Sequence, residues 1–344
     1  MNAHLQSLAI AIGNNTSMMY NNSLTCSHAD ESFKYYAYCA TYLVVFPVAF
    51  LCNIGALVVF ILQSLRSSRC STSCVVMMNL ALSDSFFSLT LPLRLTYYFS
   101  GGVWQFSDWL CRVCSYSFYV YMYTSILFLT LLSLFRWLAV AQPLLHSSQA
   151  TPTRTILVCL GIWVFVAVSS SPFLLEETED RSGHSSCFEP SSQTSWEHLL
   201  IMNYVGLAVG FLLPFFTIII CYSSLIRHLM AKSSLRCNQP TQQHNRQRSV
   251  HLVSMVIVTF LFCFLPYHVI RPLHLHAILG NWNCNVIVVL QRTVVLTLCM
   301  AAFNSVVNPL LYYYSAKTFR KDMRDVSLSL FNRERFSFML RGQL

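Results

Sequence analysis

The sixth of seven long apolar segments contains the stretch Phe260-Leu261-Phe262-Cys263-Phe264-Leu265-Pro266-Tyr267-His268-Val269-Ile270-Arg271. Its proline, histidine and arginine stand where a membrane-spanning helix tolerates few polar groups, and an ionisable residue there indicates a functional site. Residues spaced by four, seven, eleven and fourteen positions share one helix face. The side chains on that face are Phe260, Phe264, Tyr267, Arg271 and His274. We therefore predict an aromatic stripe that ends in cationic residues and contacts a ligand.

The composition is that of a membrane protein. The chain has 344 residues, of which 55% are hydrophobic and 10% are charged, whereas an average soluble domain has about 25% charged residues. A helix needs roughly 20 mostly apolar residues to cross a bilayer. Seven segments are long enough, at residues 36–62, 73–99, 108–138, 154–175, 198–230, 251–279 and 286–315. We expect an all-α membrane protein, a seven-transmembrane helix bundle over residues 36–315.

Two further segments flank the bundle. Residues 1–35 contain glycosylation sequons at Asn14, Asn15 and Asn21, which predict a glycosylated extracellular N-terminus. Residues 316–344 begin with alternating apolar and basic side chains over 316–324, the pattern of a short amphipathic helix on the membrane surface, followed by a cytoplasmic tail. Basic residues gather in this tail and in every second connecting segment, while acidic residues gather in the others. The positive-inside rule therefore places the C-terminus in the cytoplasm of a multi-pass plasma-membrane protein.

Several functional classes are excluded by what the sequence lacks. The net charge of +9 follows from the loop asymmetry, so it does not indicate nucleic-acid binding. The sequence has no phosphate loop, zinc-ligand spacing or GxSxG motif, and no nucleophile and base can be paired, so we expect neither an enzyme nor a metal centre. A seven-helix transporter or pump needs a chain of acids or a retinal lysine. No lysine lies between Lys34 and Lys232, which leaves the transporter a distant alternative.

Four of the 14 cysteines lie on the predicted outer side, at Cys26, Cys111, Cys187 and Cys284. Four cysteines allow three pairings. Cys111 begins the third span, and Cys187 lies in the middle of the loop between the fourth and fifth spans. A bond between them would hold this loop over the mouth of the bundle, so we expect the pairs Cys111–Cys187 and Cys26–Cys284.

Polar residues inside the spans are few. They lie near the middle or inner half of the first, second, third and seventh spans, at Asn53, Asp84, Ser125, Asn304 and Asn308. A lone carboxylate at the bilayer centre costs about 2.5–3.5 kcal/mol on insertion scales, so Asp84 must face polar partners, water or a cation. These residues form either a polar cluster that holds helices together or a switchable sodium or proton site.

Arg136 lies 25 residues after Cys111, about 37 Å of helix, which is one membrane thickness. It therefore lies at the opposite membrane face from the disulfide. The seventh span carries Asn308-Pro309-Leu310-Leu311-Tyr312, and the fifth carries Pro214 with Tyr222 eight residues later. Prolines break helical hydrogen bonding locally, and such breaks can act as pivots.

Taken in order along the chain, these motifs resemble those of the rhodopsin-like G-protein-coupled receptors. The matching set comprises Asn53, Asn79-Leu80-Ala81-Leu82-Ser83-Asp84, Cys111 with Arg136, Trp163, Pro214 with Tyr222, Pro266 and Asn308-Pro309-Leu310-Leu311-Tyr312. Three longer stretches are similar to cysteinyl leukotriene receptors of both types. They are Gly161-Ile162-Trp163-Val164-Phe165 with Ser169-Ser170-Ser171-Pro172-Phe173-Leu174, Cys187-Phe188-Glu189-Pro190, and Met202-Asn203-Tyr204 through Leu213-Pro214-Phe215-Phe216.

This resemblance implies a receptor that binds a lipid-tailed anionic agonist, a cysteinyl leukotriene. It implies ligand contacts at Arg94, Tyr119, Tyr267 and Arg271, and by position we add Tyr98, Tyr123 and Arg292. Snorkelling at the membrane interface is the alternative role of Arg271 and Arg292. A nucleotide or dicarboxylate receptor of the same branch is the alternative function, because Arg271 and His268 also suit phosphates.

The family also implies partners at the inner face. These are a heterotrimeric G protein, of the Gq class with calcium signalling, together with arrestin, receptor kinases and membrane lipids. The residues expected to rearrange on activation are Arg136, Tyr222, Phe264, Pro266, Pro309 and Tyr312. An allosteric sodium ion at Asp84 is the one cofactor that the family suggests.

Two positions depart from the family pattern. Phe135 stands where an acid usually precedes the third-span arginine, and Trp137 follows it. Without that carboxylate we expect weaker restraint of the resting state unless another group substitutes. Asn308 stands where branch members often have aspartate, so the sodium site has one negative charge fewer.

Overall fold

The chain forms a bundle of seven membrane-spanning helices, as expected for an all-α membrane protein. The computed structural model describes residues 31–66, 71–175, 179–181, 184–188, 193–233, 240–315, 319–320 and 323–324. Within these residues, seven helical segments are long and apolar enough to cross a membrane. The three sequons and the expected partner of Cys284, Cys26, lie outside the described residues.

The first four spans are single helices: α2 (Glu31–Arg66), α3 (Thr72–Phe99), α4 (Asp108–Ala141) and α6 (Pro152–Ser170). The fifth span joins α7 (Gln193–Val205), η2 (Gly206–Leu212) and α8 (Leu213–Ser233), and the sixth joins α9 (Pro240–Thr259), η3 (Phe260–Phe264) and α10 (Leu265–Leu279). The seventh is α11 (Cys284–Ser315). Six of the seven predicted spans fall within one of these segments, whereas the fourth, predicted to end at residue 175, runs past the end of α6 at Ser170 into a 3-10 turn. The largest shift at a span start is at the sixth, because α9 extends eleven residues before residue 251.

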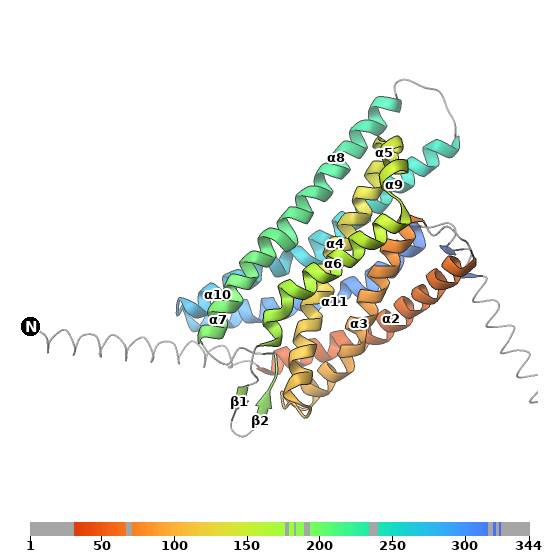
Figure 1. The fold of residues 1–344 in the computed structure, drawn as a ribbon. Coiled ribbons are helices and arrows are strands. Elements are labelled where there is room, and N and C mark those ends of the chain that lie inside the picture. The colour runs from red at the N-terminus through yellow and green to blue at the C-terminus, as the bar shows by residue number, and fades with distance from the viewer. Residues whose placement is uncertain are drawn as a thin grey trace, which may run out of the picture.

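Short elements cap the two ends of the bundle (Figure 1). At the end that holds the α7 and α10 labels, η1 (Ser171–Leu174) is followed by strands β1 (Glu179–Arg181) and β2 (His184–Ser186), which pair antiparallel with Glu179 opposite Ser186. At the other end, α5 (Pro143–Gln149) follows α4. Beyond α11, the described residues Phe319, Arg320, Met323 and Arg324 are helical, in agreement with the predicted amphipathic helix.

A disulfide joins Cys111 at the start of α4 to Cys187 directly after β2, with their Cα atoms 5.9 Å apart. The predicted pair is therefore confirmed. Cys284 is also disulfide-bonded. We call this side of the bundle the disulfide end, and the opposite side, where α4 carries Arg136, the Arg136 end.

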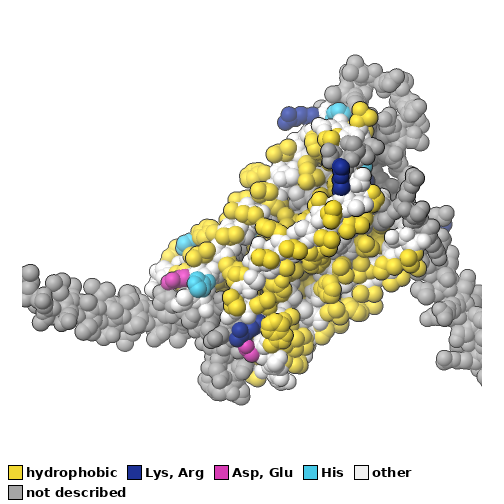
Figure 2. Space-filling view, in the orientation of Figure 1, with side chains coloured by type: hydrophobic (Ala, Val, Ile, Leu, Met, Phe, Trp, Pro, Cys, Tyr) yellow, Lys and Arg dark blue, Asp and Glu magenta, His cyan; other side chains and the backbone are white. Residues whose placement is uncertain are grey.

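The flank of the bundle is apolar and its charges lie at the ends (Figure 2). Large side chains such as Leu51, Leu157, Val164 and Ile220 are exposed there, as a bilayer requires. The interior is filled by aromatic and aliphatic side chains, among which Asn53, Asp84 and Asn308 are the central polar groups, each fully buried.

The fifth and sixth spans each contain a π-helical segment. In each case a proline follows closely, Pro214 after η2 and Pro266 after η3. Proline lacks an N–H and its ring clashes with the carbonyl four residues earlier, and one wider turn accommodates both effects. The breaks predicted from these prolines are therefore local widenings of the helix rather than interruptions of it.

Two glycines close the turn between α3 and α4. Gly101 and Gly102 have φ values of 66° and 85°, which glycine adopts without the steric cost of a Cβ. The Gly102 N–H donates to the carbonyl of Tyr97 at 3.0 Å. A Cβ added at Gly102 would overlap the hydroxyl of Tyr35 on α2. The dihedral angle therefore favours glycine at position 102, and a side chain there would also displace the hydroxyl end of Tyr35.

We expect Gly102→Ala to destabilise the protein by at least about 1–2 kcal/mol, because the left-handed conformation disfavours a Cβ, and to lower the midpoint of thermal unfolding by about 2–8 °C. The measurement is thermal unfolding of the purified protein in detergent. Gly55→Ala is the matched control, because nothing lies within 4 Å of a Cβ added in α2. Equal midpoints for the two variants would contradict this account of the turn.

Candidate functional site

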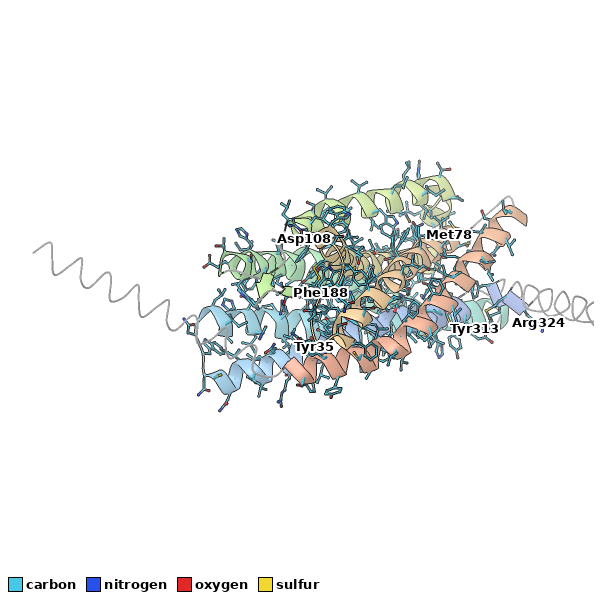
Figure 3. The ribbon with its side chains drawn as sticks, turned by 90° about the horizontal axis from the view of Figure 1, so that it is seen from below. Tyr35, Met78, Asp108, Phe188, Tyr313 and Arg324 are labelled. Carbon is cyan, nitrogen blue, oxygen red and sulfur yellow. A yellow bond between two sulfur atoms is a disulfide. The ribbon has the colours of Figure 1, made fainter. Side chains whose placement is uncertain are left out.

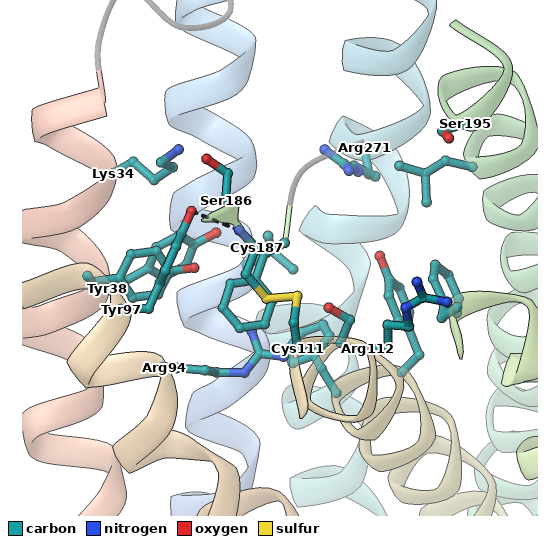
Figure 4. A pocket seen from close by; sticks show the side chains of 18 of the residues that line it. Lys34, Tyr38, Arg94, Tyr97, Cys111, Arg112, Ser186, Cys187, Ser195 and Arg271 are labelled. Atoms are coloured by element: carbon teal, nitrogen blue, oxygen red, sulfur yellow. Dashed lines mark hydrogen bonds between the residues drawn. A yellow bond between two sulfur atoms is a disulfide. The ribbon is translucent and has the colours of Figure 1, made fainter. Parts of the chain in front are cut away.

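A cavity of about 160 Å³ opens at the disulfide end between α2, α3, α4, α7, α10 and the segment around Cys187. Four cationic side chains line it, Lys34, Arg94, Arg112 and Arg271, and no aspartate or glutamate is among its described lining residues. Figure 4 shows Lys34 and Arg271 on opposite sides of the cavity, with Arg94 and Arg112 on either side of the disulfide. Arg112 forms an ion pair with Asp108, with Nη2 and Oδ2 2.6 Å apart. The positive potential that favours an anion in this cavity therefore comes mainly from Arg94 and Arg271.

Arg94 is the most deeply placed of these cations and is only 6% exposed. Its Nη2 donates to the carbonyl oxygen of Cys114 at 2.6 Å. Its Cζ lies 4.4 Å from the ring centroid of Phe188 and 5.5 Å from that of Phe118. No carboxylate among the described residues forms an ion pair with it, and its Nε has no hydrogen-bond partner there. A buried guanidinium without a counter-ion provides a binding site for an anionic group.

Aromatic side chains form the walls of the cavity. Tyr98 of α3 stacks on Tyr38 of α2 with centroids 4.6 Å apart. On the other side, the rings of Tyr119 and Phe173 stack at 3.6 Å. Tyr267 is fully buried and its hydroxyl donates to Asn203 Oδ1 at 3.5 Å. Three of the predicted contacts, Tyr98, Tyr119 and Tyr267, therefore line one cavity.

The predicted stripe lies on the interior side of the sixth span. Four of its side chains are buried: Phe260, Phe264, Tyr267 and His274. The fifth, Arg271, lines the cavity, and its Nη1 lies 3.4 Å from Nδ1 of His274. His268 is not among the residues of the predicted stripe, but it is buried too and its ring stacks on Phe211 of η2 at 4.5 Å.

Tyr123 lines a second cavity, of about 250 Å³, between α4, α6, α7 and η2. This side cavity is almost entirely apolar, and Tyr119, Phe173 and Met202 line both cavities. The ring of Tyr123 occupies the space that side chains at Gly206 and Gly210 would fill. Glycines at these two positions therefore allow the third and fifth spans to approach each other here.

Arg292 is placed away from both cavities. Its Cζ lies 5.6 Å from the ring centroid of Phe33, and its side chain is exposed. Conversely, Lys34 and Arg112 line the main cavity although they were not predicted. Arg112 follows Cys111 at the start of the third span, and Lys34 lies two residues before the predicted start of the first. A search for cations at the span ends would have found both.

The polar residues of the spans meet in the middle of the bundle. Asp84 Oδ2 accepts hydrogen bonds from Asn308 Nδ2 at 2.9 Å and from the Tyr312 hydroxyl at 3.4 Å. Asn53 Nδ2 donates to the carbonyl of Ser305 at 2.9 Å, and Asn304 Nδ2 donates to the Tyr121 hydroxyl at 3.4 Å. The buried oxygens Asp84 Oδ1, Ser125 Oγ, Asn304 Oδ1 and Asn308 Oδ1 have no hydrogen-bond partner among the described residues.

Comparison with known proteins identifies the family. Residues 53–312 match the model of the 7 transmembrane receptor (rhodopsin family). The chain belongs to this family. It is similar to the cysteinyl leukotriene receptor 2 of Mus musculus, with 42% identity over 86% of this chain and 93% of the relative. The cysteinyl leukotriene receptor 1 of Mus musculus is 36% identical over 95% of this chain and 89% of the relative. The uracil nucleotide/cysteinyl leukotriene receptor of Rattus norvegicus is 34% identical over 81% of this chain and 79% of the relative.

The protein is therefore a multi-pass plasma-membrane receptor and not an enzyme, and it acts between a ligand and a heterotrimeric G protein. The recognition made from the motifs alone is confirmed, since the matched region runs from Asn53 to Tyr312.

At the Arg136 end, two side-chain hydrogen bonds join the third, fifth and sixth spans. Trp137 Nε1 of α4 donates to Ser224 Oγ of α8 at 2.9 Å. Ser254 Oγ of α9 donates to the Tyr222 hydroxyl of α8 at 3.3 Å. These two bonds join the third span to the fifth and the fifth to the sixth. Because Phe135 stands in the sequence where the family usually has an acid, we expect these two bonds to restrain the bundle in its place.

We expect Trp137→Phe to raise ligand-free G-protein activation by about two- to tenfold, because a net hydrogen bond contributes about 0.5–1.5 kcal/mol and its loss would shift the resting equilibrium by that amount. The measurement is G-protein activation without agonist, normalised to surface expression. Trp109→Phe, at an exposed side chain of the disulfide end, should leave this signal unchanged. If Trp137→Phe also leaves it unchanged, the bond does not restrain the resting state.

Proposed function

We propose that this receptor binds cysteinyl leukotrienes and activates a G protein of the Gq class, raising intracellular calcium. The observation that carries the proposal is the main cavity, which four cationic side chains line among aromatic rings. Arg112 is paired with Asp108, whereas Arg94 and Arg271 form no ion pair with a described carboxylate. The names of the relatives support the same ligand class.

The two cavities suit the two halves of such a ligand. A cysteinyl leukotriene has a long apolar tail, a hydroxyl group and a peptide head that bears carboxylates. Guanidinium groups bind carboxylates through paired hydrogen bonds, so Arg94 and Arg271 would bind the head. The side cavity beyond Tyr119 and Phe173 is apolar and would take the tail.

In this proposal the disulfide end faces outward and the Arg136 end faces the cytoplasm, as the distribution of basic residues favours. Agonist binding shifts a two-state equilibrium of the bundle. Phe264 and Pro266 carry the change along the sixth span, and Arg136, Tyr222, Pro309 and Tyr312 rearrange where the G protein binds. Arrestin and receptor kinases would act at the same face.

A nucleotide is the second candidate ligand, because the same cations suit phosphates and because one relative is a uracil nucleotide/cysteinyl leukotriene receptor. Calcium responses of cells that express the chain, measured with ATP, UDP, a dicarboxylate and the cysteinyl leukotrienes, separate the candidates. A response to nucleotides alone would overturn the leukotriene proposal.

Replacement of Arg94 or Arg271 by alanine should lower agonist potency by about ten- to hundredfold, because a charge-assisted hydrogen bond contributes about 1.5–3 kcal/mol. Surface expression should persist in both variants. Arg154→Ala removes an exposed cation at the start of α6, far from the cavity, and should leave potency unchanged. Unaltered potency in both pocket variants would refute this placement of the agonist head.

We also propose a sodium ion at the polar centre of the bundle. The carboxylate of Asp84 and the oxygens of Ser125, Asn304 and Asn308 would hold it, because several of their buried oxygens have no partner within the described residues. A bound cation would stabilise the arrangement of the helices that binds it more tightly. The absence of a second acid at Asn308 would make this binding weak.

Sodium in place of an organic cation should lower agonist affinity of the wild-type receptor, since the ion stabilises the resting arrangement. Asp84→Asn should remove this sodium dependence, because it removes the only negative charge at the site. The measurement is agonist binding at constant ionic strength. Glu197→Gln, on α7 at the disulfide end, serves as the control, and equal sodium dependence in both variants would argue against an ion at Asp84.

A further inference from the structure

Phe188 has an unusual backbone for an aromatic residue. It directly follows the disulfide-bonded Cys187 and adopts φ of 72°, in the left-handed region that residues with a Cβ rarely occupy. Such strained residues persist only where the surrounding structure holds them, and they concentrate at binding sites. We therefore expect the contacts of the Phe188 side chain to stabilise this backbone conformation.

The surroundings of Phe188 hold both its backbone and its ring. The disulfide attaches the preceding residue to α4, and the Cys187 N–H donates to the Tyr97 hydroxyl of α3 at 3.4 Å, a bond drawn in Figure 4. The ring packs edge-on against Tyr97 at 5.3 Å and Trp104 at 5.7 Å. Figure 3 shows Phe188 at the same end of the molecule as Tyr35 and Asp108 and away from Arg324.

The consequence of this placement is a contact with Arg94. The Phe188 ring centroid lies 4.4 Å from Arg94 Cζ, and Phe118 lies 5.5 Å from the same atom. Cation–π attraction holds a guanidinium flat against an aromatic face. Its N–H donors then point outward from its edge, parallel to the ring. Nη2 is already fixed by the Cys114 carbonyl, whereas Nε has no partner among the described residues.

We propose that Phe188 is a positioning residue that fixes the plane of the Arg94 guanidinium and shields it from water, so that an anionic ligand meets its edge. The strained turn after Cys187 exists to place this ring. The inference rests on the proposed function in one respect: the anion is taken to be the agonist's carboxylate.

The first test is independent of any agonist. In the purified receptor, a dicarbonyl reagent that modifies accessible guanidinium groups should react with Arg94 several-fold faster in Phe188→Leu than in wild type, as followed by mass spectrometry. Phe188→Tyr keeps the aromatic face and should restore protection. Phe106→Leu, which alters a ring that contacts Trp104, is the matched control and should stay protected. Equal modification rates in Phe188→Leu and wild type would overturn the proposal.

The second test is a double-mutant cycle on agonist affinity. Phe188→Leu should weaken binding of a cysteinyl leukotriene by about five- to twentyfold, yet add little to the loss caused by Arg94→Ala, because Phe188 acts through Arg94. Independent, additive losses would show a merely structural role. If the wild-type receptor binds no cysteinyl leukotriene, the proposed function fails while the modification rates still decide the role of Phe188.

Discussion

The bilayer is the constraint on which the rest of this structure depends. A segment inside the hydrocarbon must satisfy its own backbone hydrogen bonds, so the spans are helices, and their outward side chains must be apolar. Polar residues are thereby confined to the interior or to the ends. Because the interior of seven packed helices is narrow, the few polar side chains present lie close enough to form defined clusters.

Two such clusters of opposite character share the helix α3. Arg94 lies ten residues from Asp84, about 15 Å along the axis. The cation has aromatic faces around it, while the carboxylate accepts from the Asn308 amide and the Tyr312 hydroxyl. The two groups form no ion pair with each other. A shift of α3 would move both at once, which gives a direct physical link between the ligand cavity and the centre of the bundle.

Periodicity and polarity predicted the spans, the stripe on the sixth helix and the residues around Asp84, because the hydrocarbon leaves polar side chains few places to lie. The two π-helical segments were not predicted, and they alter the register: each added residue turns the following helix by about 100°. His268 shows a separate limit: it lies about 100° from Tyr267 on the same helix α10, yet it is buried because the fifth span covers that side, where its ring stacks on Phe211. Arg292 illustrates another limit, since the direction of a side chain at a helix end depends on its neighbour, here Phe33. The bond from Trp137 to Ser224 joins residues 87 positions apart, and no local pattern specifies such a pairing.

The packing of Tyr123 against Gly206 and Gly210 has an evolutionary consequence. The third and fifth spans meet where one contributes a large ring and the other contributes no side chain. A larger residue at either glycine requires the ring at position 123 to move or to become smaller, and a smaller residue at 123 alone would leave a void. The three positions are therefore coupled, and we expect a lineage that altered one of them to carry a compensating change in another and a differently shaped side cavity.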